Sequence, residues 1–356
     1  MKILKKLFSG SMVCYCLCSY AQTADTSQVP LQAPFDCYRP DGYAPLGVMT
    51  DHMYFKNQWM VSYTYMDMLM SGNRSGTSKI SDDEIFQNYY ASPEKMSAQM
   101  NMLTVIYGFT DRINFMAVFN ANSNSVSMNM DPTMQTHMAE GTPTSLTTKT
   151  FGLGDTKLYA FYKWADQQHA QVVVGLGGSF PTGNIQQKGL NVAGDTSRLS
   201  YNMQLGTGTW GILPSIAYIG QSHSLSWGGS ASANVILFAN ADGYQWGNQY
   251  KGTAWLAYKW CNYISNSIRA EGIYSGSIKG YDESIAAFAN NDPTANTANY
   301  GGIYGTVYLG LNLYIPKIPH KDLRLAFEYG IPVYQNLDGI QMSMQSGFLG
   351  SLQYGF

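Results

Sequence analysis

Residues Phe348 to Phe356 read FLGSLQYGF and end the chain on an aromatic side chain. Every second residue is apolar or glycine, and these residues share one face of an extended strand: Phe348, Gly350, Leu352, Tyr354 and Phe356. The intervening residues are mostly small or polar. This alternation predicts a strand with different surroundings on its two sides, either in a membrane barrel or at the end of a soluble sandwich.

The composition favours the barrel. The stretch is similar to the C-terminal signal of bacterial outer-membrane β-barrels, which ends on an aromatic residue. Only 12% of the 356 residues are charged, whereas 14% are aromatic, including 27 Tyr. Few charges with many aromatic residues suit a barrel with aromatic girdles and polar loops. The net charge of -2 supplies no basic surplus to neutralise phosphates, so it argues against nucleic acid as a partner.

The N-terminus predicts a secretion signal over residues 1–21. Lys2, Lys5 and Lys6 precede a short, mostly apolar run, and Ala21 ends a plausible cleavage site. Residues 22–57 are rich in proline and lack periodicity, so we expect an irregular segment in the periplasm or tucked into the lumen as a small plug. The mature chain keeps Cys37 and Cys261, either as a disulfide or as two thiols.

Residues 58–356 predict an all-β, up-and-down antiparallel barrel in the bacterial outer membrane. No apolar run of eighteen residues follows the signal, so a membrane crossing requires a closed barrel. About twelve strands are expected, near residues 58–68, 98–109, 112–121, 152–164, 169–180, 208–220, 223–236, 250–260, 262–275, 302–315, 321–333 and 346–356. Short turns alternate with long polar connections such as 69–97 and 122–151, which places both termini in the periplasm.

Strand facing predicts which charges lie inside. Charges on a lipid-facing wall cost about 2–4 kcal/mol near mid-membrane, so they gather in the lumen. Six luminal charges are expected: Asp155, Lys157, Arg269, Glu271, Arg324 and Glu328. Two interpretations remain open for them, a permeation path and a salt-bridged network that holds the inside of a narrow barrel.

Two motifs carry a family resemblance. Gly152-Leu153-Gly154-Asp155 and Phe180-Pro181-Thr182-Gly183 resemble the outer-membrane transporter family described as meta-pathway phenol degradation-like. The resemblance implies a Gram-negative barrel, and the family name implies uptake of aromatic compounds. Residues 44–53 and 331–339 also resemble a methionine-rich branch of these barrels, which implies a link to metal handling.

Nineteen methionines are the distinctive residues, and most of them precede residue 140. Six alternate at predicted strand positions that face the lumen: Met66, Met68, Met70, Met96, Met100 and Met102. Met128, Met130, Met134, His137 and Met138 are expected in the next connection. The first two strands are neighbours, so their methionine rows are expected to stand side by side.

Thioether sulfur favours Cu(I) over hard cations, so two or three of these methionines, with His52 or His137, would form a weak metal site. Two alternatives remain open. Methionine also fills irregular interiors, and it also lines channels for apolar ligands.

Nothing in the sequence predicts an enzyme or a cofactor. The five histidines fit no His-Glu-x-x-His pattern, and no Gly-x-Ser-x-Gly elbow occurs. The expected function is passage of a small solute, with a soft metal ion such as copper as its sharpest version. The partners are then outer-membrane lipid and a small solute or metal ion. The alternative is a structural or surface-binding barrel that transports nothing because its lumen is filled.

Overall fold

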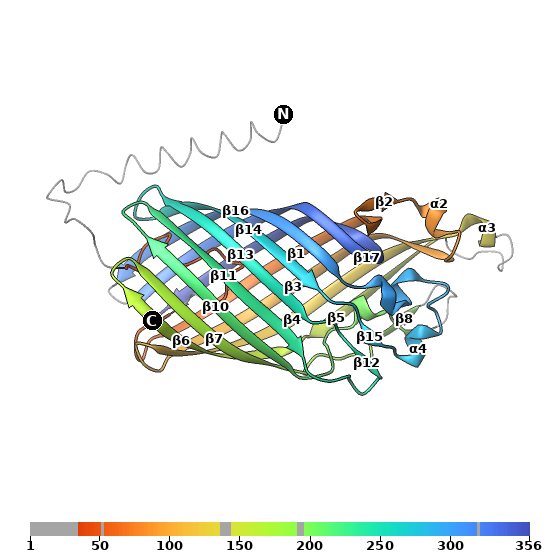
Figure 1. Cartoon of the computed structure of the whole chain (residues 1–356), viewed down its shortest axis with the longest axis horizontal. Helices are drawn as coiled ribbons and strands as arrows, with labels where there is room; N and C mark the ends of the chain where they lie inside the picture. The colour runs from red at the N-terminus through yellow and green to blue at the C-terminus, as the bar shows by residue number, and fades with distance from the viewer. Residues whose placement is uncertain (1–34, 51–52, 136–143, 191–195, 319–320) are drawn as a thin grey trace, which may run out of the picture.

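The computed structural model describes residues 35–50, 53–135, 144–190, 196–318 and 321–356. One antiparallel sheet closes on itself as a barrel, with short turns at one end and long loops and short helices at the other (Figure 1). Eleven strand elements form the closed path. They are β1 (Trp59–Gly76), β3 (Ala91–Gly108), β4 (Ile113–Met130), β6 (Thr156–Gln167), β7 (Ala170–Phe180), β10 (Gly211–Gln221), β11 (Leu225–Ile236), β13 (Gln249–Lys259), β14 (Ile264–Ser275), β16 (Gly302–Ile318) and β17 (Lys321–Gly355).

The remaining elements lie at the end of the barrel that carries the long loops, called the loop end below. Two strands extend the barrel sheet, β2 (Ser78–Ile80) beside β1 and β5 (Ser145–Leu153) beside β4. Two small hairpin sheets pair β8 (Lys188–Leu190) with β9 (Thr196–Arg198) and β12 (Tyr244–Gln245) with β15 (Lys279–Gly280). The helices are α2 (Asp82–Ile85), α3 (Pro132–Gln135), α4 (Glu283–Ala286), η1 (Tyr201–Met203), η2 (Pro293–Ala295) and η3 (Thr297–Asn299). None of the helices described is long and apolar enough to cross a bilayer.

The last element, β17, contains two successive strands of the barrel. Its first half pairs with β16 up to Leu337, and its second half pairs with β1 from Leu337 to Gly355. Between β17 and β1 the sheet contains ten successive pairs of neighbouring strands, and each pair is antiparallel. Strand direction reverses at each pair, so after ten reversals β1 runs in the same direction as the half of β17 that pairs with β16. If β17 were one straight strand, it would therefore pair with β1 in parallel. The pairing with β1 is antiparallel, so the chain reverses between the halves, where Gly339 has a φ of +66°. If the two halves of β17 are counted separately, the eleven elements form a barrel of twelve strands, in agreement with the about twelve that the sequence predicts.

Several strands are longer than predicted. β1, β3 and β4 each span 18 residues, whereas a tilted strand needs about 9–11 to cross a bilayer. Their loop-side halves carry the residues assigned above to connections 69–97 and 122–151, so those boundaries were wrong. Met128 and Met130 lie in β4 and not in a loop. The polar residues of these halves hide the alternation because neither face meets lipid there.

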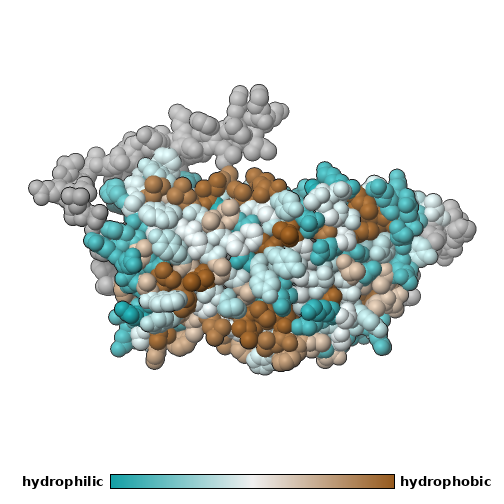
Figure 2. Space-filling model, in the orientation of Figure 1, coloured by the Kyte–Doolittle hydropathy of each residue, from teal (hydrophilic) through white to brown (hydrophobic). Residues whose placement is uncertain are grey.

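The two faces of the wall differ as expected. Ile268 of β14 is 49% exposed on the outside, whereas its neighbour Arg269 is 1% exposed on the inside. Apolar side chains gather in patches on the outer surface (Figure 2). Outward aromatic residues cluster near the short-turn end: Trp59, Phe109, Phe115, Tyr162, Trp164, Trp227, Tyr258, Trp260, Tyr263, Tyr354 and Phe356. Such a girdle marks the periplasmic interface, since outer-membrane barrels keep their short turns there.

Candidate functional site

The N-terminal segment, residues 35–50 and 53–58, packs against inward-facing side chains of the barrel wall. Tyr43, Met53 and Tyr54 join the inward residues Met60 and Phe161 in one buried apolar cluster. Ala44 and Val48 pack against Ile219 and Trp255 in a second cluster. The segment therefore occupies the periplasmic half of the lumen.

Polar side chains of the wall hold this segment by its backbone. Arg324 donates to the carbonyl oxygen of Arg39 at 3.0 Å and also to that of Cys37. Lys251 donates to the carbonyl oxygen of Gly47 at 3.1 Å. The amide of Gln221 donates to the carbonyl oxygen of Asp36 at 3.0 Å and accepts from its backbone N–H. The guanidinium of Arg324 also stacks on the rings of Tyr43 and Tyr314.

A charged cluster made of Arg269, Glu271 and Glu328 lies against the segment at Gly47. Arg269 donates to both carboxylate oxygens of Glu328, at 3.1 and 2.8 Å, and to Glu271 at 2.7 Å. Its guanidinium carbon lies 3.8 Å from the centroid of the Tyr308 ring. Arg269 and Glu328 are 1% and 2% exposed. A buried charge that is paired and hydrogen-bonded on several sides is held rigidly, so this cluster forms a fixed surface against which the segment packs.

The inner loop, residues 181–210 without 191–195, folds against the inside of the wall at the loop end. Its anchor is Asp155, 7% exposed, which lies in the break between β5 and β6. One carboxylate oxygen of Asp155 accepts from the backbone N–H of Gly183 at 3.0 Å. The other accepts from the backbone N–H and the hydroxyl of Thr207, at 2.8 and 2.7 Å. The two family motifs thus meet here, and Thr182 donates to the carbonyl of Gly154 at 2.8 Å.

A row of polar side chains on β4 and β5 continues this attachment. Asn122 donates to the carbonyl oxygen of Leu205 at 3.2 Å, and Asn124 donates to that of Asn202 at 3.3 Å. Thr150 donates to the carbonyl oxygen of Met203 at 3.0 Å. As with the N-terminal segment, the wall binds backbone carbonyl groups. The inner loop narrows the lumen on the extracellular side.

The methionine rows lie between these two obstructions. Met66 stands directly opposite Met100 across the β1–β3 pair, and Met70 stands opposite Met96. Met70 is also the cross-strand partner of Met344 on β17. Toward the loop end, Met70 and Met96 pack with Leu199 and Met203 of the inner loop. Toward the periplasm, Met102 packs against the cluster that holds the N-terminal segment.

The remaining predicted site residues lie at several places in the structure. Lys157 of β6 faces inward near Asp155. Met68 lies opposite Ala98 on the inward row. His52 and His137 lie outside the described residues. Cys37 and Cys261 are not joined to each other by a disulfide. Among the residues described, no three His, Cys, Asp or Glu side chains form a group that fits a metal ion.

Sequence reasoning missed the carbonyl-binding residues Gln221, Asn122, Asn124 and Thr150. Nothing in their local pattern distinguishes them from other polar strand and loop residues. The inward position of Asn122 and Asn124 follows from strand parity with Val118, yet their partners lie some 80 residues away. Only the tertiary structure brings them together.

Comparisons with known proteins agree with this fold. The sequence profile of the family described as "Putative MetA-pathway of phenol degradation" matches residues 75–304, well over half of the chain. No curated protein sequence matches. Among solved structures, an outer membrane channel from Pseudomonas putida F1 is 14% identical, covers 86% of this chain and 97% of its own, and has a TM-score of 0.53.

A second structure, the P. putida toluene transporter TodX, is 10% identical over 84% of this chain and 89% of its own, with a TM-score of 0.41. The fold is shared with the first of these structures, and the profile match covers the inner loop and most of the strands. The chain is an outer-membrane β-barrel, and it belongs to the family described as the putative MetA-pathway of phenol degradation.

Proposed function

We propose that the barrel passes a small solute across the outer membrane through its lumen, and that the N-terminal segment shifts to allow passage. One observation carries this proposal. The lumen is occupied by two chain segments that the wall holds through their backbone carbonyl groups. Hydrogen bonds of this kind contribute about 0.5–1.5 kcal/mol each, or about 1.5–3 kcal/mol when the donor is charged, so they can be broken in turn.

The sharper version of the proposal makes the solute a soft metal ion. Met66 and Met100 face each other, and neither belongs to the apolar clusters above and below them. Directly opposed residues have Cβ atoms about 4.5–5.5 Å apart, which lets two thioethers approach one ion. Thioether sulfur favours Cu(I) and Ag(I). Met70 and Met96 are weaker candidates, because they already pack against Leu199 and Met203.

Single-channel conductance in planar bilayers tests both versions. Deletion of residues 35–50 from the mature chain is expected to raise conductance. Addition of Ag(I) is expected to reduce the current through this open form, and the double substitution Met66→Leu with Met100→Leu is expected to remove that block. Met130→Leu with Met342→Leu is the matched control, since both side chains pack against the apolar cluster at the inner loop.

A second candidate function is a structural or surface-binding barrel that transports nothing. The observation in its favour is that the N-terminal segment and the inner loop occupy both halves of the lumen. If the deletion variant carries no current, passage is excluded and this candidate stands. If the deletion variant conducts but Ag(I) has no effect, only the soft-metal version fails.

A further inference from the structure

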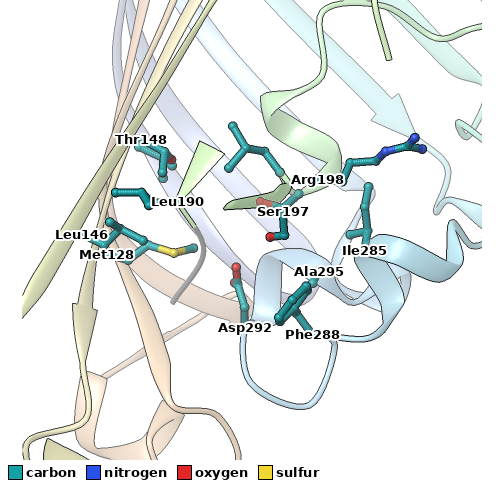
Figure 3. Close-up of a pocket in the computed structure, with 13 residues that line it drawn as sticks. Met128, Leu146, Thr148, Leu190, Ser197, Arg198, Ile285, Phe288, Asp292 and Ala295 are labelled. Carbon is teal, nitrogen blue, oxygen red and sulfur yellow. The ribbon is translucent and has the colours of Figure 1, made fainter. Parts of the chain in front are cut away.

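A small cleft lies at the extracellular end, between the wall and the loops. Its walls come from β4 and β5, from the β8–β9 hairpin, and from the loop that carries α4 and η2 (Figure 3). Most of the lining is apolar, and it includes Val126, Met128, Leu190 and Phe288. The polar lining residues are Thr148, Ser197, Arg198, Ser200 and Asp292. Ser197 and Asp292 point toward each other across the cleft (Figure 3).

Asp292 is a buried carboxylate that lacks a counter-ion. It is 9% exposed, and one of its oxygens accepts from the backbone N–H and the hydroxyl of Thr294, both at 2.7 Å. Within the described part of the chain, no lysine or arginine forms an ion pair with it. Burying an ionised carboxylate without a partner is costly, so this site favours a cation or a strong hydrogen-bond donor.

Arg198 lines the same cleft, yet its charge is already used. Its guanidinium pairs with Asp242 at 2.9 Å and with Asp282 at a shorter distance. The three residues join the inner loop to both neighbouring extracellular loops and together carry one net negative charge. Arg198 therefore does not neutralise Asp292.

The hydroxyl of Ser197 is the second unsatisfied group. Its Oγ atom is buried and has no hydrogen-bond partner among the described residues. Nearly all buried polar atoms in proteins have a partner, so this hydroxyl is available to bond a group that enters the cleft. Its position opposite Asp292 places a donor–acceptor pair at one end of an apolar cleft.

We propose that this cleft binds a small organic cation, with an ammonium group between Asp292 and Ser197 and a short apolar body against the surrounding side chains. The cleft holds about 40 Å³, whereas a cavity of about 150 Å³ accepts benzene. A chain of a few carbon atoms therefore fits better than an aromatic ring. The flexible side chains of Met128 and Leu190 adapt to its length. The proposal does not depend on passage through the lumen, because the residues that line the cleft are not those that hold the N-terminal segment.

The chain supplies its own control for the capping role of Asp292. The sequence Asp-Pro-Thr occurs at Asp131 and again at Asp292. Asp131 is 8% exposed and accepts from the N–H and hydroxyl of Thr133, at 2.8 and 2.7 Å. The local geometry is thus the same, but Asp131 does not line the cleft. A difference between the two positions reports the cleft and not the turn.

Calorimetric titration of the detergent-solubilised protein with propylammonium, 1-propanol and propionate tests this proposal. The wild-type protein is expected to bind propylammonium at least tenfold more tightly than 1-propanol, and propionate least. Asp292→Asn is expected to weaken propylammonium binding about tenfold, whereas Asp131→Asn leaves it unchanged. Heat-modifiable gel migration confirms that each variant is folded.

The outcomes separate cleanly. Absence of propylammonium binding to the wild-type protein overturns the proposal. Equal loss in Asp131→Asn and Asp292→Asn also overturns it, because the effect then belongs to the turns. Loss in Asp292→Asn alone, accompanied by weaker binding in Ser197→Ala, supports an ammonium site between these two side chains.

Discussion

The backbone of Gly47 lies directly against the guanidinium group of Arg269. A Cβ atom on Gly47 would lie 2.3 Å from the guanidinium carbon. An arginine tip usually swings away from such a contact, but here Glu328 and Glu271 hold it through three hydrogen bonds. The position therefore has no room for any side chain while the N-terminal segment stays in place.

The first prediction concerns this contact. Gly47→Val is expected to displace the N-terminal segment and raise single-channel conductance toward that of the deletion of residues 35–50. Gly252→Val is the control, because a Cβ atom at Gly252 meets nothing within 4 Å. If Gly47→Val conducts like the wild-type protein, the segment does not close the lumen.

The second prediction concerns the charged cluster. Glu328→Leu leaves the buried Arg269 without its main partner, and removing one member of a buried pair costs about 3–5 kcal/mol. Urea unfolding in detergent is expected to report a loss of that size. Combining it with Arg269→Met is expected to recover most of the stability, because Glu271 keeps Lys251 as an ion-pair partner at 3.7 Å and no buried charge is left uncompensated. A double variant as unstable as Glu328→Leu alone would contradict this account.

The third prediction concerns the anchor of the inner loop. Asp155→Asn presents an amide group in place of one carboxylate oxygen, so it cannot accept all three hydrogen bonds from Gly183 and Thr207. The loop is expected to detach, and trypsin is expected to cleave after Lys188 or Arg198 several-fold faster. Asp166→Asn, at the periplasmic turn, is the control. Equal cleavage rates in the two variants would rule out the anchoring role.

The fourth prediction concerns pH. Burial raises the pKa of Asp292 to about 6, although the two hydrogen bonds from Thr294 act in the opposite direction. The carboxylate is thus charged above pH 6 and neutral below it. Propylammonium stays protonated, so its affinity is expected to fall about tenfold between pH 7.5 and pH 5.

Two neighbours of Asp292 are relevant to that titration. Arg198 keeps its charge throughout this range. Burial raises the pKa of Tyr300 further above its ordinary value, so its ring stays neutral, and its hydroxyl donates to the carbonyl oxygen of Thr294. The pH response is therefore assigned to Asp292. Titration of the Asp292→Asn variant is expected to be flat, and a slope that persists there would assign it elsewhere.

The sequence predicts the barrel strands better than it predicts how the N-terminal segment and the inner loop are held inside the barrel. Alternation at Phe348–Phe356 is visible because one face meets lipid and the other does not, and the same is true of Ile268 and Arg269. The sequence also predicts that the methionine rows of the first two strands stand side by side, but the register that places Met66 opposite Met100 was not predicted. Where the strands extend beyond the membrane this contrast between the two faces disappears. The predicted ends of β1, β3 and β4 were therefore wrong.

The contacts inside the lumen were not predictable from local patterns. Asp155 falls on the inward face by parity, but its partner Thr207 is 52 residues away and belongs to a loop without periodicity. Asp292 gave no signal either, because Asp-Pro-Thr predicts only a turn. Such sites depend on which loops fold inward, and that depends on many weak contacts at once.

The seam of the barrel also governs how the protein assembles. Trp59 and Phe356 exchange two backbone hydrogen bonds, each 2.8 Å long. The first and last strands of the barrel therefore pair as far as Phe356. Joining residues 297 positions apart costs about 5 kcal/mol of chain entropy, plus a constant. Until β1 and the second half of β17 pair, the sheet has two edges with unpaired backbone groups, and such edges favour aggregation. The barrel wall is therefore complete only when the strand that ends at Phe356 has paired with the strand that begins at Trp59.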